Sequence, residues 1–218
     1  MSPFQLYLFS SNLQALGSLL LIIISAFTIR QNKSIEVRLI LLYGSGSILF
    51  HLAQKTYKEY VNTIGDYFVL FEATLFLLLF YFSMTNSVIK KLGIVMVFSF
   101  YLFFLLYKID GQDIMGASIR TFRDILLIAF SIIYSVYIIK NLPEQRLSSI
   151  PMFWINSSVL IFFSSTLMLS LTMSYIVTVH RNDFSFFWAF RNILRFVFCL
   201  GISLGIWKAY VLTHSKKH

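Results

Sequence analysis

Six ionisable side chains lie within long apolar stretches of this sequence, where few charged groups are found. They are His51, Glu72, Arg123, Asp124, Arg191 and Arg195. A charge inside a membrane costs several kcal/mol unless it is paired or hydrated, so such residues are by default candidates for function. The guanidinium of arginine matches carboxylate and phosphate groups with a planar fork of donors. These six residues therefore predict a site that binds a small anionic or zwitterionic ligand.

The spacing of the charged residues brings several of them to shared helix faces. Pairs four residues apart lie on one face of a helix, and three pairs have this spacing: His51 with Lys55, Arg120 with Asp124, and Arg191 with Arg195. At 1.5 Å per residue, the six candidates lie roughly 6–14 Å below the ends of the expected helices. Lipid would not tolerate such a layer, so we expect it to face the interior of a helix bundle.

Two interpretations of this charged layer remain open. In the first, Arg191 and Arg195 form an anion-binding arm, and His51 and Glu72 close the pocket from the opposite wall. In the second, the charges form an internal ion-pair network that fixes helix packing and binds nothing. In both, an unpaired carboxylate would be costly, so we predict that Glu72 pairs with Arg195 or Arg123.

The elements that position these residues are expected to be membrane-spanning helices. Hydrophobic residues make up 58% of the 218 residues and charged residues 12%, whereas soluble domains average about 25% charged residues. Apolar segments long enough to cross about 30 Å of hydrocarbon lie roughly at 6–29, 37–55, 66–86, 91–108, 117–140, 151–178 and 186–210. The sequence predicts an all-α membrane protein, a seven-transmembrane-helix bundle in one domain over residues 1–218. A six-helix alternative would make the fourth or fifth segment re-entrant.

Basic residues in the connections predict an orientation with the N-terminus outside and the C-terminus inside. The first, third and fifth connections and the C-terminal tail hold ten basic residues beside two acidic ones. The opposite ends hold eight basic residues beside six acidic ones, and several of these basic residues lie within helices rather than loops. The net charge of +9 is thus concentrated at span ends, a distribution that excludes nucleic-acid binding.

Several smaller features concern helix packing. No basic n-region precedes the first apolar stretch, so we interpret it as a retained helix rather than a cleaved signal. None of the three prolines falls inside a span. Gly201 and Gly205 form a GxxxG motif that permits close helix contact, and we expect this contact within the chain rather than between chains. Polar residues around Asn156 and Thr166 indicate either interhelical hydrogen bonds or a translocation path. We expect most phenylalanines and tyrosines to face lipid or the interface.

Three kinds of chemistry lack the residues they need. A retinal Schiff base requires a lysine near the middle of the last span, but Lys208 lies at its end. A zinc hydrolase requires three or four clustered ligands, and only His51 among four histidines is well placed. Serine-protease chemistry requires a base beside a membrane-embedded serine, and only His51 with Glu72 suggests such a base. We therefore assign no catalytic residue, metal or cofactor.

Three stretches resemble a group of small, uncharacterised seven-helix bacterial integral membrane proteins. They are Phe71–Leu77 (FEATLFL), the run from Phe153 through Asn156 to Ser165, and the segment from Arg191-Asn192-Ile193-Leu194 to Trp207-Lys208. The resemblance covers most of the chain, although its motifs are apolar and of low specificity. It implies a multi-pass protein of the bacterial inner membrane that accompanies sensory histidine kinases, and it carries no established activity.

The leading functional hypothesis from the sequence is a sensor or receptor-like membrane subunit with an outward-facing polar pocket. Since the sequence shows no room for a cytoplasmic domain, such a subunit would signal through a cytoplasmic or membrane partner. The alternatives are a small-solute transporter or permease component, and a structural or assembly subunit without a ligand. The absence of internal repeats and of prolines within spans disfavours transport.

Overall fold

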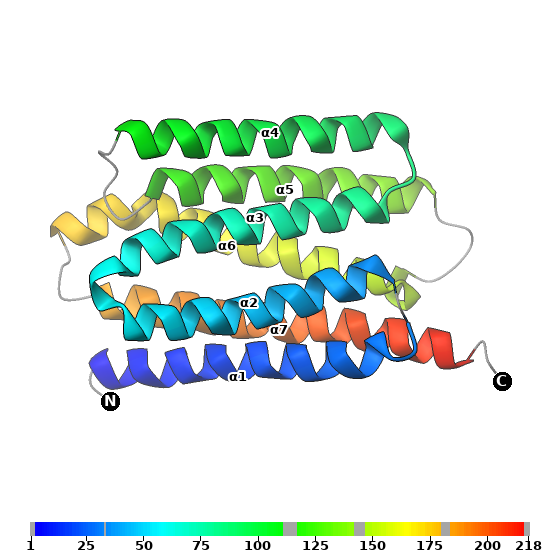
Figure 1. The fold of residues 1–218 in the computed structure, drawn as a ribbon, viewed down its shortest axis with the longest axis horizontal. Coiled ribbons are helices and arrows are strands. Elements are labelled where there is room, and N and C mark those ends of the chain that lie inside the picture. Colours follow the sequence, from blue (N-terminus) through cyan, green and yellow to red (C-terminus); the bar gives the residue numbers. More distant parts are fainter. Residues whose placement is uncertain (1–2, 33, 111–116, 142–146, 180–183, 216–218) are drawn as a thin grey trace.

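The computed structural model is a bundle of long helices that lie side by side (Figure 1). It describes residues 3–32, 34–110, 117–141, 147–179 and 184–215, with side chains for 5–32, 34–109, 118–141, 147–172 and 185–212. The elements are α1 (Pro3–Ile29), α2 (Ile35–Thr56), the short 3-10 helix η1 (Lys58–Tyr60), α3 (Val61–Ser83), α4 (Ser87–Asp110), α5 (Ala117–Lys140), the 3-10 helix η3 (Leu147–Ser149), α6 (Pro151–Val179) and α7 (Phe184–Ser215).

The seven α-helices are each long and apolar enough to cross a membrane, which confirms the predicted number of spans within the described residues. Successive helices run in opposite directions (Figure 1). The beginnings of α1, α3, α5 and α7 therefore lie at the same end of the bundle as the last turns of α2, α4 and α6. We call this end the N-terminal end. The arrangement is a multi-pass helical bundle in which no described residue forms a strand.

Apolar side chains cover the outside of the bundle as well as its core. Leu49, Phe98 and Ile109 are 66%, 70% and 82% exposed, as expected for surfaces that contact lipid rather than water. The core contains a cluster of fully buried phenylalanines: Phe76, Phe80, Phe130, Phe162, Phe163 and Phe198. The expectation that aromatic residues mostly face lipid is wrong for this group. Lipid and a membrane-protein core are both apolar, so composition does not separate them.

Small residues allow α7 and α6 to approach closely. A Cβ atom added at Gly201 would collide with the side chain of Ser158, and one added at Gly205 would meet Ile155 and the carbonyl oxygen of Pro151. Side chains at these positions would force the two helices apart. The GxxxG motif therefore serves packing within the chain, as predicted.

Helix bounds differ from the predicted segments mainly in α3. The predicted segment 66–86 is displaced, because α3 already begins at Val61 and ends at Ser83. The first turns of α3 include polar residues that have partners inside the bundle. Asp66 is buried, and its Oδ2 forms an ion pair of 2.6 Å with Nζ of Lys108 on α4. The other helices begin up to four residues before the predicted segments and end up to five residues after them. Because α3 starts earlier, Glu72 lies deeper than predicted.

Candidate functional site

Glu72 of α3 lies at the centre of a set of buried charged contacts. Its Oε2 accepts a hydrogen bond of 2.5 Å from Nη1 of Arg123 on α5, and its Oε1 accepts one of 2.7 Å from Nη2 of Arg195 on α7. The hydroxyl of Tyr43 on α2 donates to the same Oε1 at 3.0 Å. The predicted pairing of Glu72 with Arg195 or Arg123 is confirmed for both arginines. One carboxylate thus joins four helices.

Asp124 completes this set on α5 and α6. Its Oδ1 accepts hydrogen bonds from Nε and Nη2 of Arg123, at 2.9 and 2.6 Å. Its Oδ2 accepts one of 3.0 Å from the hydroxyl of Thr166 on α6. Arg123, Asp124 and Glu72 are each 0% exposed. Thr166, part of the polar stripe noted in the sequence, therefore makes an interhelical hydrogen bond.

We call Glu72, Arg123, Asp124 and Arg195 the buried ion network. Its two carboxylates balance its two guanidinium groups, so it carries no formal net charge. Glu72 and Arg195 each lie eleven residues after the first residue of their helix, about 16 Å along the helix axis at 1.5 Å per residue. The predicted depth of 6–14 Å was therefore too shallow for this pair. The network lies near the middle of α3 and not near its N-terminal end.

A cavity of about 100 Å³ lies between this network and the N-terminal end of the bundle. We call it the arginine cavity, because Arg120 of α5 and Arg191 and Arg195 of α7 all line it. The other described lining residues are Tyr7, Ser11, Gln14, His51, Gln54, Gly65, Phe68, Val69, Trp188 and Asn192. None of these is acidic. A cavity of this size has room for several water molecules or one small anion.

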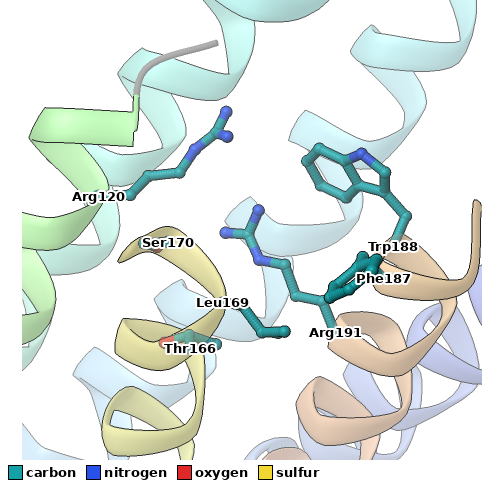
Figure 2. A pocket seen from close by; sticks show the side chains of 7 residues that line it. All are labelled: Arg120, Thr166, Leu169, Ser170, Phe187, Trp188 and Arg191. Carbon is teal, nitrogen blue, oxygen red and sulfur yellow. The ribbon is translucent and has the colours of Figure 1, made fainter. Parts of the chain in front are cut away.

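Arg120 and Arg191 are brought together at one side of this cavity. Figure 2 draws the lining of a smaller adjoining cavity that shares these residues, and it shows the two guanidinium groups pointing toward the same space from α5 and α7, beside the indole ring of Trp188. The guanidinium carbons of Arg120 and Arg191 lie 5.7 and 5.1 Å from the centre of that ring. This is within the range of a cation–π contact. No described carboxylate forms an ion pair with either arginine, so two positive charges share one aromatic ring.

Two buried nitrogen atoms at the arginine cavity have no hydrogen-bond partner among the described residues. They are Nε of Arg195 and Nε2 of His51. Arg195 is 7% exposed, and its Nη2 is already engaged by Glu72. A buried N–H without an acceptor costs free energy. The two nitrogens are therefore available to a molecule that enters the cavity.

A larger groove of about 370 Å³ continues from the arginine cavity toward the surface. The two spaces share the lining residues Tyr7, Ser11, His51 and Gln54. Leu8 of α1, Val61 of α3, and the exposed Lys55 and Lys58 complete the groove. A smaller cavity of about 30 Å³ adjoins on the other side and shares Arg120, Trp188 and Arg191. No acidic side chain is among the described residues lining these spaces either.

The structure divides the six predicted site residues into two groups. His51, Arg191 and Arg195 line the arginine cavity, whereas Glu72, Arg123 and Asp124 lie in the buried ion network and do not line the cavity. Only Arg195 belongs to both. Glu72 therefore does not form the opposite wall of the cavity, because both of its oxygens already accept bonds inside the bundle.

Among the lining residues that sequence reasoning missed, Arg120 and Trp188 matter most for the charge of the cavity. Arg120 was noted only for its spacing from Asp124, and its position three residues into α5 placed it near a helix end. It is nevertheless 8% exposed. A signal was present, since Trp188 lies three residues before Arg191 and therefore on the same helix face.

Comparisons with known proteins provide no information on the function of this chain. No protein-family model, curated protein or solved structure matches this chain. Within the described residues, no three histidine, cysteine, aspartate or glutamate side chains are grouped so as to hold a metal ion. The chemistry that the described site can perform is recognition of an anion by guanidinium, imidazole and amide donors.

Proposed function

We propose that this chain is a receptor-like, multi-pass membrane protein that binds a small anionic ligand in the arginine cavity. The observation that carries the proposal is the charge of the cavity. Three arginines line it, and only Arg195 has a carboxylate partner among the described residues, Glu72; Arg120 and Arg191 have none. Unneutralised arginines inside a membrane protein are expensive. An anion supplied from outside would neutralise them.

The depth of the site supports a receptor more than a transporter. Beyond Arg195 and Glu72, the next turns of α7 and α3 place Phe198 and Phe76 in the core, with ring centres 5.5 Å apart. Phe162 of α6 stacks on Phe198 at 4.5 Å. These three rings are at most 2% exposed. In this conformation the buried ion network and, beyond it, this layer of packed aromatic rings fill the bundle behind the cavity, as expected of a binding pocket rather than a channel.

The proposed orientation follows from the basic residues of the connections. With the N-terminus outside, the groove and the arginine cavity open to the external side of the membrane. A receptor of this kind would pass its signal to a cytoplasmic or membrane partner. The orientation can be tested by attaching a membrane-impermeant maleimide to single cysteines in intact cells.

Two exposed positions suit this labelling test. Glu59→Cys on η1 lies at the N-terminal end, and Ser87→Cys begins α4 at the opposite end. The native Cys199 is buried and contributes little background. We expect Glu59→Cys to be labelled from outside and Ser87→Cys only after the cells are opened. The reverse pattern would refute the orientation.

Ligand binding can be tested with purified protein in a neutral detergent. Phosphate, sulfate, carboxylates and amino acids are screened for an increase in the thermal unfolding midpoint, since a ligand at about one hundred times its dissociation constant stabilises by about 2.7 kcal/mol. We expect an anion to stabilise the wild type and to have no effect on Arg191→Gln. Lys90→Gln removes a charge on α4 and should respond like the wild type. No stabilising anion, or equal responses from all three proteins, would contradict the proposal.

A transport assay separates the receptor from a permease. A radiolabelled form of any anion found in the screen is offered to proteoliposomes that contain the protein. We expect binding without accumulation inside the vesicles. Protein-dependent accumulation would replace the receptor proposal with transport.

A further inference from the structure

The shape and charge of the two connected spaces specify the ligand further. We infer that the ligand is an amphiphilic phosphate monoester, with its phosphate in the arginine cavity and one apolar chain in the groove between α1 and α2. This inference rests on the proposed function, because it names the class of anion that the cavity receives. Three observations carry it: charge, donor geometry and volume.

The charge of the arginine cavity matches a dianion better than a carboxylate. Glu72 compensates Arg195, whereas Arg120 and Arg191 have no described carboxylate partner. Among the described residues, the unmatched charge of the cavity is therefore two. A phosphate monoester carries about −1.5 to −2 at pH 7, whereas a single carboxylate carries one negative charge. Two guanidinium groups over one indole ring also repel each other, and a dianion between them would remove that repulsion.

The donors around the cavity suit a group with several acceptor oxygens. Arg120 and Arg191 offer guanidinium N–H groups from two helices (Figure 2). Nε of Arg195 adds a third donor that has no partner within the described residues, and the side chain that carries it is more than nine-tenths buried. A phosphate monoester presents three terminal oxygens as strong acceptors. A planar carboxylate presents two.

The volumes require that a larger ligand extend beyond the cavity. At about 100 Å³, the arginine cavity is smaller than the 150 Å³ that holds benzene in an engineered core, so it accommodates little more than a head group. The adjoining groove has about 370 Å³ and continues through shared lining residues. An occupant of both spaces would contact the residues that the two spaces share, among them Ser11 and Gln54.

The groove has the character expected of a site for an anchored acyl chain. Tyr7, Leu8 and Val61 line it and are 37%, 45% and 41% exposed. Lys55 and Lys58 lie at the same place, at the last turn of α2 and in η1. Helix ends with lysine are found at the level of lipid head groups. The groove therefore lies at the boundary between the head groups and the apolar layer, and a ligand whose chain occupies it would have its phosphate drawn inward by the arginines.

The experiment compares four probes on purified protein in a neutral maltoside detergent. They are a single-chain lysophosphatidic acid, glycerol 3-phosphate, a monoacylglycerol of the same chain, and a lysophosphatidylcholine of the same chain. The readout is the thermal unfolding midpoint at increasing probe concentration. We expect lysophosphatidic acid to bind about tenfold or more tightly than glycerol 3-phosphate, because the two attached parts bind as one. The other two probes should give no shift.

Two variants of the groove test where the chain lies. Val61→Trp and Leu8→Trp fill the groove from opposite walls at exposed positions. Either should reduce the affinity for lysophosphatidic acid to that for glycerol 3-phosphate and leave the latter unchanged. Arg191→Gln should abolish the response to both phosphates.

Each of the other results of this experiment would refute a specific part of the inference or the proposed function. Equal affinity for the two phosphates, or full response to lysophosphatidic acid in both tryptophan variants, would show a water-soluble phosphate site and refute the amphiphile. Stabilisation by a carboxylate but by neither phosphate would refute the phosphate monoester and keep the anion receptor. Response to monoacylglycerol alone would assign the groove to neutral lipid and also refute the inference. A failure of every anion would refute the proposed function itself.

Discussion

The buried ion network and the arginine cavity are neighbours built from the same residue types, yet their charges are treated in opposite ways. In the network, Arg123 directs three nitrogens to two carboxylates and is 0% exposed. In the cavity, the guanidinium groups of Arg120 and Arg191 lie over the ring of Trp188, and no described carboxylate forms an ion pair with either. Arg195 connects the two regions, with Nη2 in the first and Nε in the second.

This difference separates a structural use of arginine from the binding use that we propose. Removing one partner of a fully paired buried charge destabilises the protein, because the other charge is left buried alone. A fully paired charge also has no free donor or acceptor to offer a ligand. A buried charge without a partner is costly, and the cost is recovered when an anion binds. Charge balance, rather than burial, therefore distinguishes the two regions.

The largest expected effect comes from opening the buried ion network. Glu72→Ala removes the acceptor of Arg123, Arg195 and Tyr43 and leaves Arg195 without a carboxylate. We expect the free energy of unfolding in detergent to fall by about 3–5 kcal/mol, the usual cost of breaking a buried ion pair. The measurement is chemical or thermal unfolding followed by circular dichroism.

Two further variants calibrate that loss. Glu72→Gln keeps a side-chain oxygen and should cost less than alanine. Glu59→Ala removes the same charge from an exposed position on η1 and should change stability by less than about 0.5 kcal/mol. If Glu72→Ala changed the free energy of unfolding as little as Glu59→Ala, the buried ion network would not have the structural role that distinguishes it from the arginine cavity.

In the arginine cavity, we expect a substitution to change stability little and ligand affinity strongly, the opposite of what we expect in the buried ion network. Arg120→Gln removes a guanidinium that has no described carboxylate partner, so the unliganded protein should keep its stability within about 1 kcal/mol, the scale of a cation–π contact. Its affinity for the stabilising anion should fall by about 10- to 100-fold, the value of hydrogen bonds to a charged group. Thermal unfolding with and without the anion measures both quantities. A strongly destabilised Arg120→Gln with unchanged affinity would make this region structural too.

A pair of substitutions at Gly65 tests the cavity without altering charge. A Cβ atom at this position would lie 3.5 Å from both Nη2 of Arg120 and Nε2 of Gln54, which is ordinary contact distance. Gly65→Ala should therefore bind the anion as the wild type does. Gly65→Leu extends into the space and should weaken binding by about tenfold, because overpacking costs roughly 1–3 kcal/mol. Equal binding by the two variants would place the anion outside this cavity.

The sequence predicted the bundle and the pairing of Glu72 because both follow from strong physical constraints. Runs of apolar residues of this length have few alternatives to a membrane helix, and a carboxylate among them needs a partner. Asp124 and Arg123 were likewise expected in the interior, and both are fully buried.

The division between network and cavity could not be predicted, because it depends on how each helix is rotated. Arg120 and Arg123 are one turn apart on α5, yet Arg123 reaches Glu72 and Arg120 reaches Trp188. The depth of Glu72 depended on where α3 begins, and the polar first turns of α3 concealed that. Phe76 and Phe198 belong to the core rather than the lipid face, a choice that hydropathy does not encode.

The smallest expected effect concerns the two lysines of the groove. Lys55 and Lys58 are exposed at the rim, whereas Arg191 lies inside the cavity. Rim charges act mainly on the rate of encounter, and contacts inside a pocket act on the rate of release.

A double variant, Lys55→Gln with Lys58→Gln, should therefore slow association of the anion by about two- to fivefold at low salt and leave its dissociation nearly unchanged. The difference should disappear near 1 M salt, where the Debye length is about 3 Å. Stopped-flow tryptophan fluorescence can measure both rates, since Trp188 lines the cavity. Arg191→Gln should instead accelerate dissociation at every salt concentration. If the lysine variant changed dissociation and Arg191→Gln changed association, the anion would rest at the rim, and the arginine cavity would not be its site.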